Sequence, residues 1–290
     1  SRMFESAVRV ALAKIKRQSD DLSCLLGGDL LNQIISSGFA AREIRAPFIG
    51  LYGACSTISE GLMLGGMLVD GGFAELAACA ASSHFSAAER QFRYPLEMGV
   101  QAVPSSQRTV TGAGSIIIQA AGEFRPGAGN VFEHVALTGG TIGSVEDFGI
   151  TDANNMGAAM APAAFKTIKT HLSDYSRRVE DYDRIITGDL GIFGSDMLYE
   201  LLRGEGIEIA DRHEDCGKLM FSPEQNVNCG ASGCGCAATI MSSWFLPKIE
   251  SGEIRRVLFL ATGALMSPVS SLQGESIPSI AHAVVIEHID

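Results

Sequence analysis

Several cysteines and histidines stand where the chain is expected to change direction, and their side chains could do chemistry. Cys55 lies in LYGACSTISEGL, residues 51–62, between an apolar run and a helical pattern. A thiol at a helix start faces backbone N–H groups and the positive end of the helix dipole, which together favour the thiolate. Cys55 is therefore a candidate nucleophile, a candidate ligand contact, or a small residue that fits a tight corner.

Two histidines and two arginines are further candidates. His84 follows AACAASS, a predicted strand end on the same side of the sheet as Cys55, and is the best histidine for a shared pocket. A lone histidine is nevertheless more often a structural group. His213 is expected in a charged loop, DRHEDCG, and is either a specific contact or a surface residue. Arg90 and Arg93 could bind a carboxylate together, or pair with nearby glutamates or a partner subunit.

The segment CGASGCGC carries three cysteines, Cys229, Cys234 and Cys236. A metal site would need a fourth ligand at a regular spacing, and none is near. The same segment holds Gly233-x-Gly-x-x-Ala, a loose dinucleotide fingerprint, but the preceding EQNVNCGAS is not a buried strand. Small residues that pack a helix start against a sheet explain this segment better than a metal or a nucleotide.

The composition predicts a soluble protein with a large core. The chain has 290 residues, of which 46% are hydrophobic, and a formal net charge of -11. This charge argues against nucleic acid and anionic lipid as general partners, since both need a basic face. The seven cysteines have no disulfide-framework spacing, which favours a reducing compartment. The longest uncharged stretch, residues 226–247, is too polar to span a bilayer, and no signal peptide opens the chain.

Helical and strand patterns alternate along the chain. Phe4, Val8, Leu12 and Ile15 are spaced as on one face of an amphipathic helix. Strands are predicted over residues 22–28, 47–54 and 75–83, with a helix over 56–69. This alternation predicts a layered α/β fold with parallel sheets.

An internal repeat divides the chain into two similar halves. DLSCLLGGDL (21–30) returns as YDRIITGDL (182–190), so that Asp29 corresponds to Asp189. VDGGFAELAACAASS (69–83) returns as IESGEIRRVLFLATG (249–263). We therefore expect two α/β halves, residues 1–150 and 151–290, with the helices 56–69 and 236–249 packed against each other at the centre. Because such halves usually begin with a strand and this chain opens on a helix, we expect that an N-terminal strand is missing.

A duplicated α/β chain with a cysteine at a strand-to-helix corner resembles the thiolase superfamily. More specifically, the chain resembles the stage V sporulation protein AD family from about residue 6 to its end. The strings that carry this resemblance are GACST, LVDGGFA, SSHFSAAERQFRYPLE, TVTGAG, GITDANNMGAAMAPAA, GASGCGC, ATGALMSP and ESIPSIAHAVV. The resemblance implies a five-layer α-β-α-β-α fold and the binding of dipicolinic acid, which the family is implicated in moving into and out of spores.

The sequence departs from the catalytic thiolase pattern. Where condensing enzymes of this superfamily carry histidine or asparagine, this chain offers Gly188 and Asp189, and Val227 stands at another histidine position. The second thiolase cysteine is also missing, because no cysteine lies in residues 237–290. Thiolate attack and condensation need such acid–base groups and oxyanion donors. The resemblance therefore implies that Cys55 contacts a ligand and is no nucleophile, in a protein without condensing activity.

The predicted function is dipicolinic acid binding, with calcium as a possible companion ion, for transport across the spore inner membrane. The implied ligand-binding residues are Cys55, Ser56, His84, Gly230, Ser232, Gly233, Gly235 and Gly263. The implied partners are membrane proteins of the dipicolinate channel and a second copy of the chain, whose interface would lie near the strand within residues 109–119. Two alternatives stay open: an acyltransferase that uses a coenzyme A or carrier-protein thioester at Cys55, and a structural subunit with a vestigial pocket.

Overall fold

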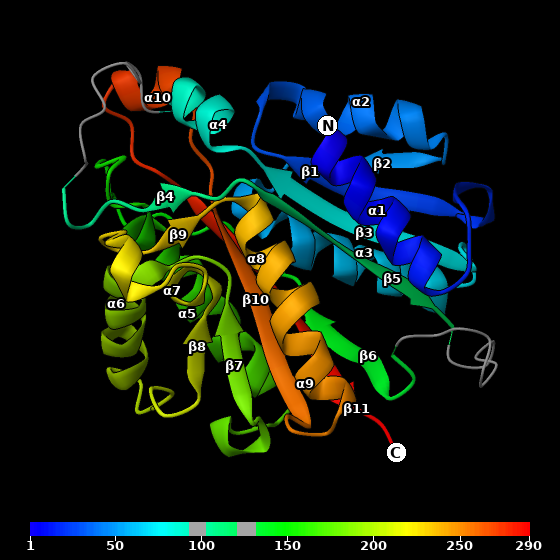
Figure 1. Cartoon of the computed structure of the whole chain (residues 1–290). Helices are drawn as coiled ribbons and strands as arrows, with labels where there is room; N and C mark the ends of the chain where they lie inside the picture. The colour runs from blue at the N-terminus through cyan, green and yellow to red at the C-terminus, as the bar shows by residue number, and fades with distance from the viewer. Residues whose placement is uncertain (93–102, 121–131) are drawn as a thin grey trace.

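The computed structural model describes residues 1–92, 103–120 and 132–290. Arg93, one of the two arginines singled out above, therefore lies outside the described residues. Two main sheets are stacked between layers of helices (Figure 1). The first sheet has the strand order β2 (Phe48–Gly50), β1 (Cys24–Asp29), β3 (Leu76–Ser83), β5 (Gly112–Gln119). All residues of β1 and β3 are buried, because helices cover both faces of this sheet.

The second sheet has five strands, in the order β6 (Val135–Thr141), β11 (Ser279–His288), β10 (Arg256–Ala264), β7 (Arg184–Thr187), β8 (His213–Asp215). A two-stranded sheet of β4 (Arg108–Thr109) and β9 (Ala231–Ser232) joins segments that are distant in sequence. Strand β6 precedes residue 150 but hydrogen-bonds to β11, so the second sheet includes a strand from the first 150 residues.

The strand pairing confirms the internal repeat. In the first sheet β1 pairs in parallel with β2 and β3, and β3 pairs antiparallel with β5. In the second sheet β7 pairs in parallel with β8 and β10, and β10 pairs antiparallel with β11. The expected parallel pairing is found among β1, β2 and β3 and among β7, β8 and β10, but each sheet also contains antiparallel pairs, which the sequence had not predicted. Among the described residues, β6 has no counterpart in the first sheet.

The helices form three layers, which gives the expected five-layer α-β-α-β-α architecture. Helices α1 (Arg2–Lys14) and α2 (Ile35–Ile44) cover the outer face of the first sheet, and α5 (Met156–Asp174) and α6 (Gly191–Arg203) lie on the outer side of the second (Figure 1). Between the sheets lie α3 (Thr57–Asp70) and the segment formed by α8 (Cys234–Ile240), a π-helical turn (Met241–Phe245) and α9 (Leu246–Glu250). The predicted central pair of helices, 56–69 and 236–249, is thus confirmed.

Small residues let the middle layer approach the first sheet closely. A Cβ atom added to Gly114 of β5 would lie 2.2 Å from the carbonyl oxygen of Ala238 on α8. A Cβ atom on Gly65 of α3 would lie 2.8 Å from the sulfur of Cys79 on β3. Glycine at these contacts therefore sets the separation between helix and sheet.

We predict that Gly114→Ala lowers the free energy of unfolding by about 1–3 kcal/mol, because the new methyl group overlaps the backbone of α8. Gly38→Ala on α2 is the matched control. A Cβ atom there meets nothing within 4 Å, so we expect a gain of about 0.5–1 kcal/mol from helix propensity. Urea unfolding of both variants measures the difference, and equal effects would contradict the close approach.

Candidate functional site

Cys55 occupies the predicted corner between the first sheet and α3. It lies in a short 3-10 turn, Ala54–Ser56, whose residue Ala54 has φ of 50°, in the left-handed region. This conformation is unfavourable for a residue with a side chain. Hydrogen bonds hold the turn: Ser56 Oγ donates to the Gly53 carbonyl at 2.6 Å, and Thr57 Oγ1 donates to the Ala54 carbonyl at 2.7 Å. These two hydrogen bonds hold the turn in its unfavourable conformation and so fix the direction of the Cys55 thiol.

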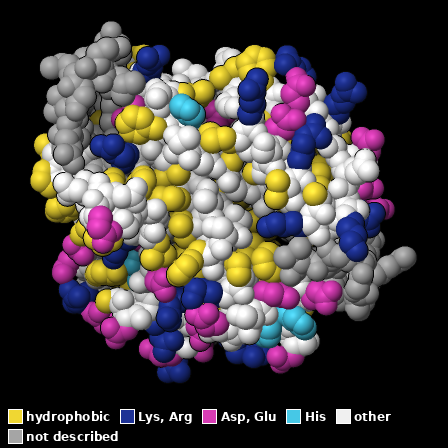
Figure 2. All heavy atoms as spheres, viewed as in Figure 1, with side chains coloured by type: hydrophobic (Ala, Val, Ile, Leu, Met, Phe, Trp, Pro, Cys, Tyr) yellow, Lys and Arg dark blue, Asp and Glu magenta, His cyan; other side chains and the backbone are white. Residues whose placement is uncertain are grey.

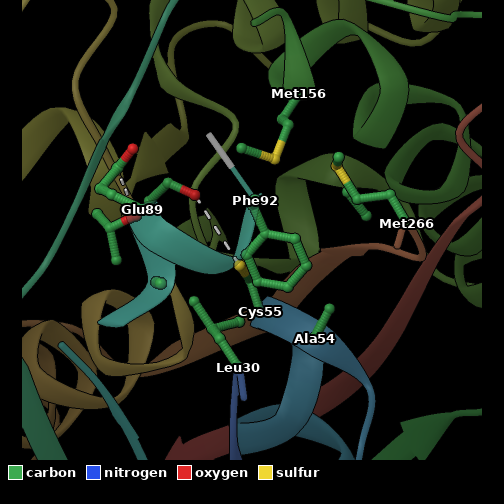
Figure 3. A pocket seen from close by; sticks show the side chains of 11 residues that line it. Leu30, Ala54, Cys55, Glu89, Phe92, Met156 and Met266 are labelled. Atoms are coloured by element: carbon green, nitrogen blue, oxygen red, sulfur yellow. Dashed lines mark hydrogen bonds between the residues drawn. The ribbon is translucent and has the colours of Figure 1, made fainter. Parts of the chain in front are cut away.

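A concave pocket that is partly open to solvent lies above Cys55 (Figure 3). Its walls come from both halves of the chain, and most of them are apolar. The lining residues are Leu30, Ala54, Cys55, Ala88, Glu89, Phe92, Thr109, Met156, Ser232, Ala264 and Met266. Phe92, Met156 and Met266 stand around the opening, and Cys55 lies deeper (Figure 3). This apolar, concave shape is typical of a small-molecule site.

Glu89 is the charged side chain among the described residues that line the pocket. It comes from α4 (Phe85–Phe92), is 5% exposed and accepts a hydrogen bond from Thr109 Oγ1 at 2.9 Å. Thr109 in turn pairs with Ser232 across the β4–β9 sheet. This small sheet therefore brings a polar side chain from each half to the same wall.

Ser232 connects Cys55 to a buried carboxylate. Its Oγ donates to Asp189 Oδ2 at 2.9 Å, which uses its single hydrogen. Ser232 Oγ must then accept from the Cys55 thiol, whose sulfur lies 3.9 Å away. The hydrogen bonds thus run in one direction, from Cys55 through Ser232 to Asp189.

Asp189 is fully buried and is held from two further directions. Its Oδ2 also accepts from the Gly233 N–H at 2.8 Å, and its Oδ1 accepts from Thr262 Oγ1 at 3.1 Å. Burial raises the pKa of Asp189 to about 6, although the bonds from Gly233, Cys55 and Ser232 oppose the shift. The carboxyl group therefore changes charge close to neutral pH.

The same environment keeps Cys55 protonated. Burial, followed by the negative charge of Asp189, raises the pKa of the Cys55 thiol well above its usual value. The sequence had favoured a thiolate because the thiol stands at a helix start. In the folded chain, desolvation and the neighbouring carboxylate outweigh that helix-start effect, so the nucleophilic form is suppressed.

A second buried network positions the loop that carries Asp189. Asp215 accepts hydrogen bonds from Thr187 Oγ1 and from the backbone N–H groups of Leu190 and Gly191. Because the Thr187 hydrogen goes to Asp215, His213 Nε2 must donate to Thr187, and His213 Nδ1 accepts from Tyr199 Oη. Burial lowers the pKa of His213 to about 3. His213 is thus a neutral structural residue of β8, and its expected place in a charged loop was wrong.

The predicted site residues are only partly assembled at the pocket. Cys55 and Ser232 line it, and the fully buried Ser56 lies beside Cys55 in the turn. The predicted glycines shape the surroundings: Gly263 faces the Gly53 carbonyl, Gly233 and Gly235 face Ser83, and Gly230 faces Gly217. His84 is exposed before α4 and is absent from the lining.

Two residues of the site were not predicted, Glu89 and Asp189. Asp189 had been noted only as the replacement of a catalytic group, although the repeat had matched it to Asp29. Glu89 could not be found from the sequence, because nothing in SSHFSAAERQ indicates which side of α4 is buried. Only the packed structure places its carboxylate against Thr109.

The three cysteines of CGASGCGC serve different contacts. The Cys234 thiol donates to the Ala54 carbonyl at 2.9 Å, which ties the start of α8 to the Cys55 turn. Cys229 accepts from the Phe193 N–H at 3.4 Å, and Cys236 is fully buried. Within the part of the chain that the structure describes, no group of three or more His, Cys, Asp or Glu side chains is placed to hold a metal ion.

The sequence matches the family model "Stage V sporulation protein AD (SpoVAD)" over residues 1–287. The chain belongs to the stage V sporulation protein AD family. It is 45% identical to stage V sporulation protein AD of Bacillus subtilis (strain 168) over 285 residues, which cover 98% of this chain and 81% of that protein. A protein of this family is a sporulation protein, as the resemblance had implied. None of the described helices is long and apolar enough to cross a membrane.

Solved structures of other proteins have the same fold. A crystal structure of OleA from Xanthomonas campestris matches with a TM-score of 0.64 and 12% identity over 98% of this chain and 81% of that one. The 3-oxoacyl-(acyl carrier protein) synthase III of Pseudomonas aeruginosa PAO1 matches with a TM-score of 0.58 and 13% identity over 100% and 83%. These similarities confirm the thiolase-like architecture predicted for the family.

We predict that Asp189→Asn changes how stability depends on pH. A buried acid with a raised pKa favours its neutral form, so its contribution to stability is full below pH 4 and is lost as the pH rises through 6. A shift from 3.8 to about 6 corresponds to about 3 kcal/mol.

The free energy of unfolding of Asp189→Asn, relative to the wild type, should therefore rise by about 2 kcal/mol between pH 4.5 and pH 7.5. Urea unfolding at the two pH values measures this change. A constant difference between the two proteins would show that Asp189 is ionised throughout.

Proposed function

We propose that this chain binds dipicolinic acid in the Cys55 pocket, for the uptake or release of dipicolinic acid across the spore inner membrane. Membership of the stage V sporulation protein AD family supports a role in sporulation. The observation that carries the ligand is the pocket itself, in which a thiol and a hydroxyl lie deep behind apolar walls. A flat pyridine ring suits walls formed by Leu30, Phe92 and two methionines, because methionine sulfur packs well against aromatic rings.

The polar end of the pocket supports binding over acyl transfer. Acyl transfer through Cys55 would need a thiolate and a base able to maintain it. Cys55 is instead a thiol that donates to Ser232, and the nearest carboxylate raises its pKa. A protonated thiol can donate a hydrogen bond to a ligand carboxylate, which is a binding role.

Charge decides the form in which the ligand would enter. The chain has a net charge of -11, and Asp189 and Glu89 place two carboxyl groups near the pocket. A free dianion would be repelled, whereas a calcium-neutralised complex would be repelled less. We therefore propose that calcium accompanies dipicolinic acid as part of the ligand.

A second copy of the chain is the first proposed partner. Strand β5 lies at one edge of the first sheet, and no strand among the described residues pairs with its outer side. On the same face, the centre over α8 carries hydrophobic and uncharged side chains, while charged side chains gather around it (Figure 2). Trp244 lies in the π-helical turn that follows α8, and its side chain is 51% exposed. Edge-to-edge pairing of β5 would bury this face. Membrane proteins of the spore are the second proposed partners.

We predict that titration calorimetry detects dipicolinic acid binding to the wild type, and that Cys55→Trp abolishes it by filling the pocket. Cys55→Ala should weaken binding by about 1–2 kcal/mol, because one donor is lost. Cys79→Ala is the matched control: Cys79 is equally buried but bonds to the Gly61 carbonyl, away from the pocket. Unchanged affinity in a folded Cys55→Trp variant would place the ligand elsewhere, and failure of the wild type to bind would favour a structural subunit.

We also predict that incubation with acetyl coenzyme A leaves Cys55 unmodified, since the thiol stays protonated. Intact-protein mass spectrometry is the measurement, and the same protein unfolded in urea at alkaline pH provides the reactive control. A stable acetyl adduct on Cys55 with turnover would instead support the acyltransferase alternative.

A further inference from the structure

The two Gly-Asp-Leu motifs of the repeat have diverged in what their aspartates bind. Asp29, at the end of β1, accepts from the Leu31 N–H, the Ser37 N–H and Ser37 Oγ, all within its own loop and the helix that follows. Asp189, its counterpart after β7, accepts from Ser232, Gly233 and Thr262, which belong to other segments of the chain. Asp29 therefore stabilises a local turn, whereas Asp189 is directed toward the pocket wall.

The surroundings of Asp189 do not neutralise its charge. The titratable groups that face it are Cys55 from the turn before α3, Cys234 and Cys236 from α8, and Asp215 and Cys216 where β8 meets α7 (Cys216–Leu219). Four of these are thiols with raised pKa values, and the fifth is another acid. Repulsion from Asp215 adds to burial, and together they bring the pKa of Asp189 to about 6.

Ser232 transmits the charge state of Asp189 to the pocket. With Asp189 ionised, the Ser232 hydrogen is held in a charge-assisted bond, and only oxygen lone pairs face Cys55 and the pocket. A carboxylate ligand would then meet an acceptor where it needs a donor. With Asp189 neutral, the bond is weaker and the Ser232 hydroxyl can turn its hydrogen toward the ligand.

We propose that Asp189 couples ligand binding to proton uptake. A free carboxylate ligand enters the pocket only when Asp189 takes up a proton. This inference rests on the proposed binding of dipicolinic acid. Asp189 acts through Ser232 and is a positioning residue. Ligand binding should thus consume about one proton at pH values where Asp189 is otherwise ionised.

The test is calorimetric titration of the full chain with dipicolinate, without calcium, at pH 6 and pH 8. Both ligand carboxyl groups are ionised across this range, so the ligand itself contributes no change. For the wild type we expect affinity to fall by up to about 100-fold between these pH values, the limit for uptake of one proton. Asp189→Asn should bind with nearly equal affinity at both pH values, and at pH 8 more tightly than the wild type.

Two controls separate this effect from a loss of structure. Asp29→Asn, the equivalent substitution in the other half, should keep the pH dependence of the wild type. The neutral diamide of the same pyridine ring should bind the wild type without pH dependence. If Asp189→Asn does not fold, proton uptake can still be measured on the wild type. Titrations with dipicolinate at pH 7.5 in buffers of different ionisation enthalpy should show uptake of nearly one proton per ligand.

The possible failures are distinguishable. If dipicolinate binds the wild type with the same affinity at pH 6 and pH 8 and without proton uptake, the role of Asp189 is wrong and the binding function stands. If Asp189→Asn keeps the pH dependence of the wild type, another group carries the proton and the assignment is also wrong. If dipicolinate binds at neither pH, the proposed function fails, and the inference fails with it.

Discussion

The close approach of the Cys55 turn to the start of α8 is the contact on which the rest of the site depends. The Cys234 thiol donates to the Ala54 carbonyl, and a Cβ atom on Gly263 would lie 2.3 Å from the Gly53 carbonyl. The Cys55 turn can lie this close to β10 only because Gly263 has no side chain. Cys55, Ser232 and Asp189 come from separate segments, and this contact brings them into one hydrogen-bonded chain.

The site takes its electrostatic character from a buried carboxylate, Asp189, whose hydrogen-bond partners in the described part of the chain are all uncharged. Asp189 bonds to one backbone N–H group and two hydroxyls, which stabilise an ionised carboxylate less than a cation would. Asp215, in contrast, accepts three backbone N–H groups and a hydroxyl. Asp215 maintains the loop, and the loop holds Asp189 beside Ser232. The hydrogen bonds that Asp215 accepts thereby fix the position of Asp189.

Proteins of one fold can keep a corner and change its chemistry. The similarity to condensing-enzyme structures is 11–15% in sequence, which shows a shared architecture alone. In this chain Cys55 stands at the corner, and its neighbours are the hydroxyl of Ser232 and the carboxylate of Asp189. Its thiol is therefore a hydrogen-bond donor. An apolar pocket with a protonated thiol at its base is suited to holding a ligand.

The sequence by itself determined the family, the layered fold and the corner. These predictions rest on local patterns, which can be recognised in a single sequence. The patterns are the helical spacing of Phe4, Val8 and Leu12, the apolar run of β1 and the repeated Gly-Asp-Leu motif. The sequence alone also placed Cys55 at the start of α3. The antiparallel edges of the sheets could not be read in this way, because strand direction depends on pairing between distant segments.

Only the tertiary structure decided the charge state of the site. The helix start predicted a stabilised thiolate at Cys55, but the pKa of a buried thiol depends on water excluded by other segments and on the nearby Asp189, 134 residues further along the chain. The same reason separates His84 from His213. Sequence patterns suggested a pocket for the first and a charged loop for the second, whereas packing left His84 exposed and buried His213 between Tyr199 and Thr187. Desolvation is a property of the assembled layers, so no single stretch of sequence contains it.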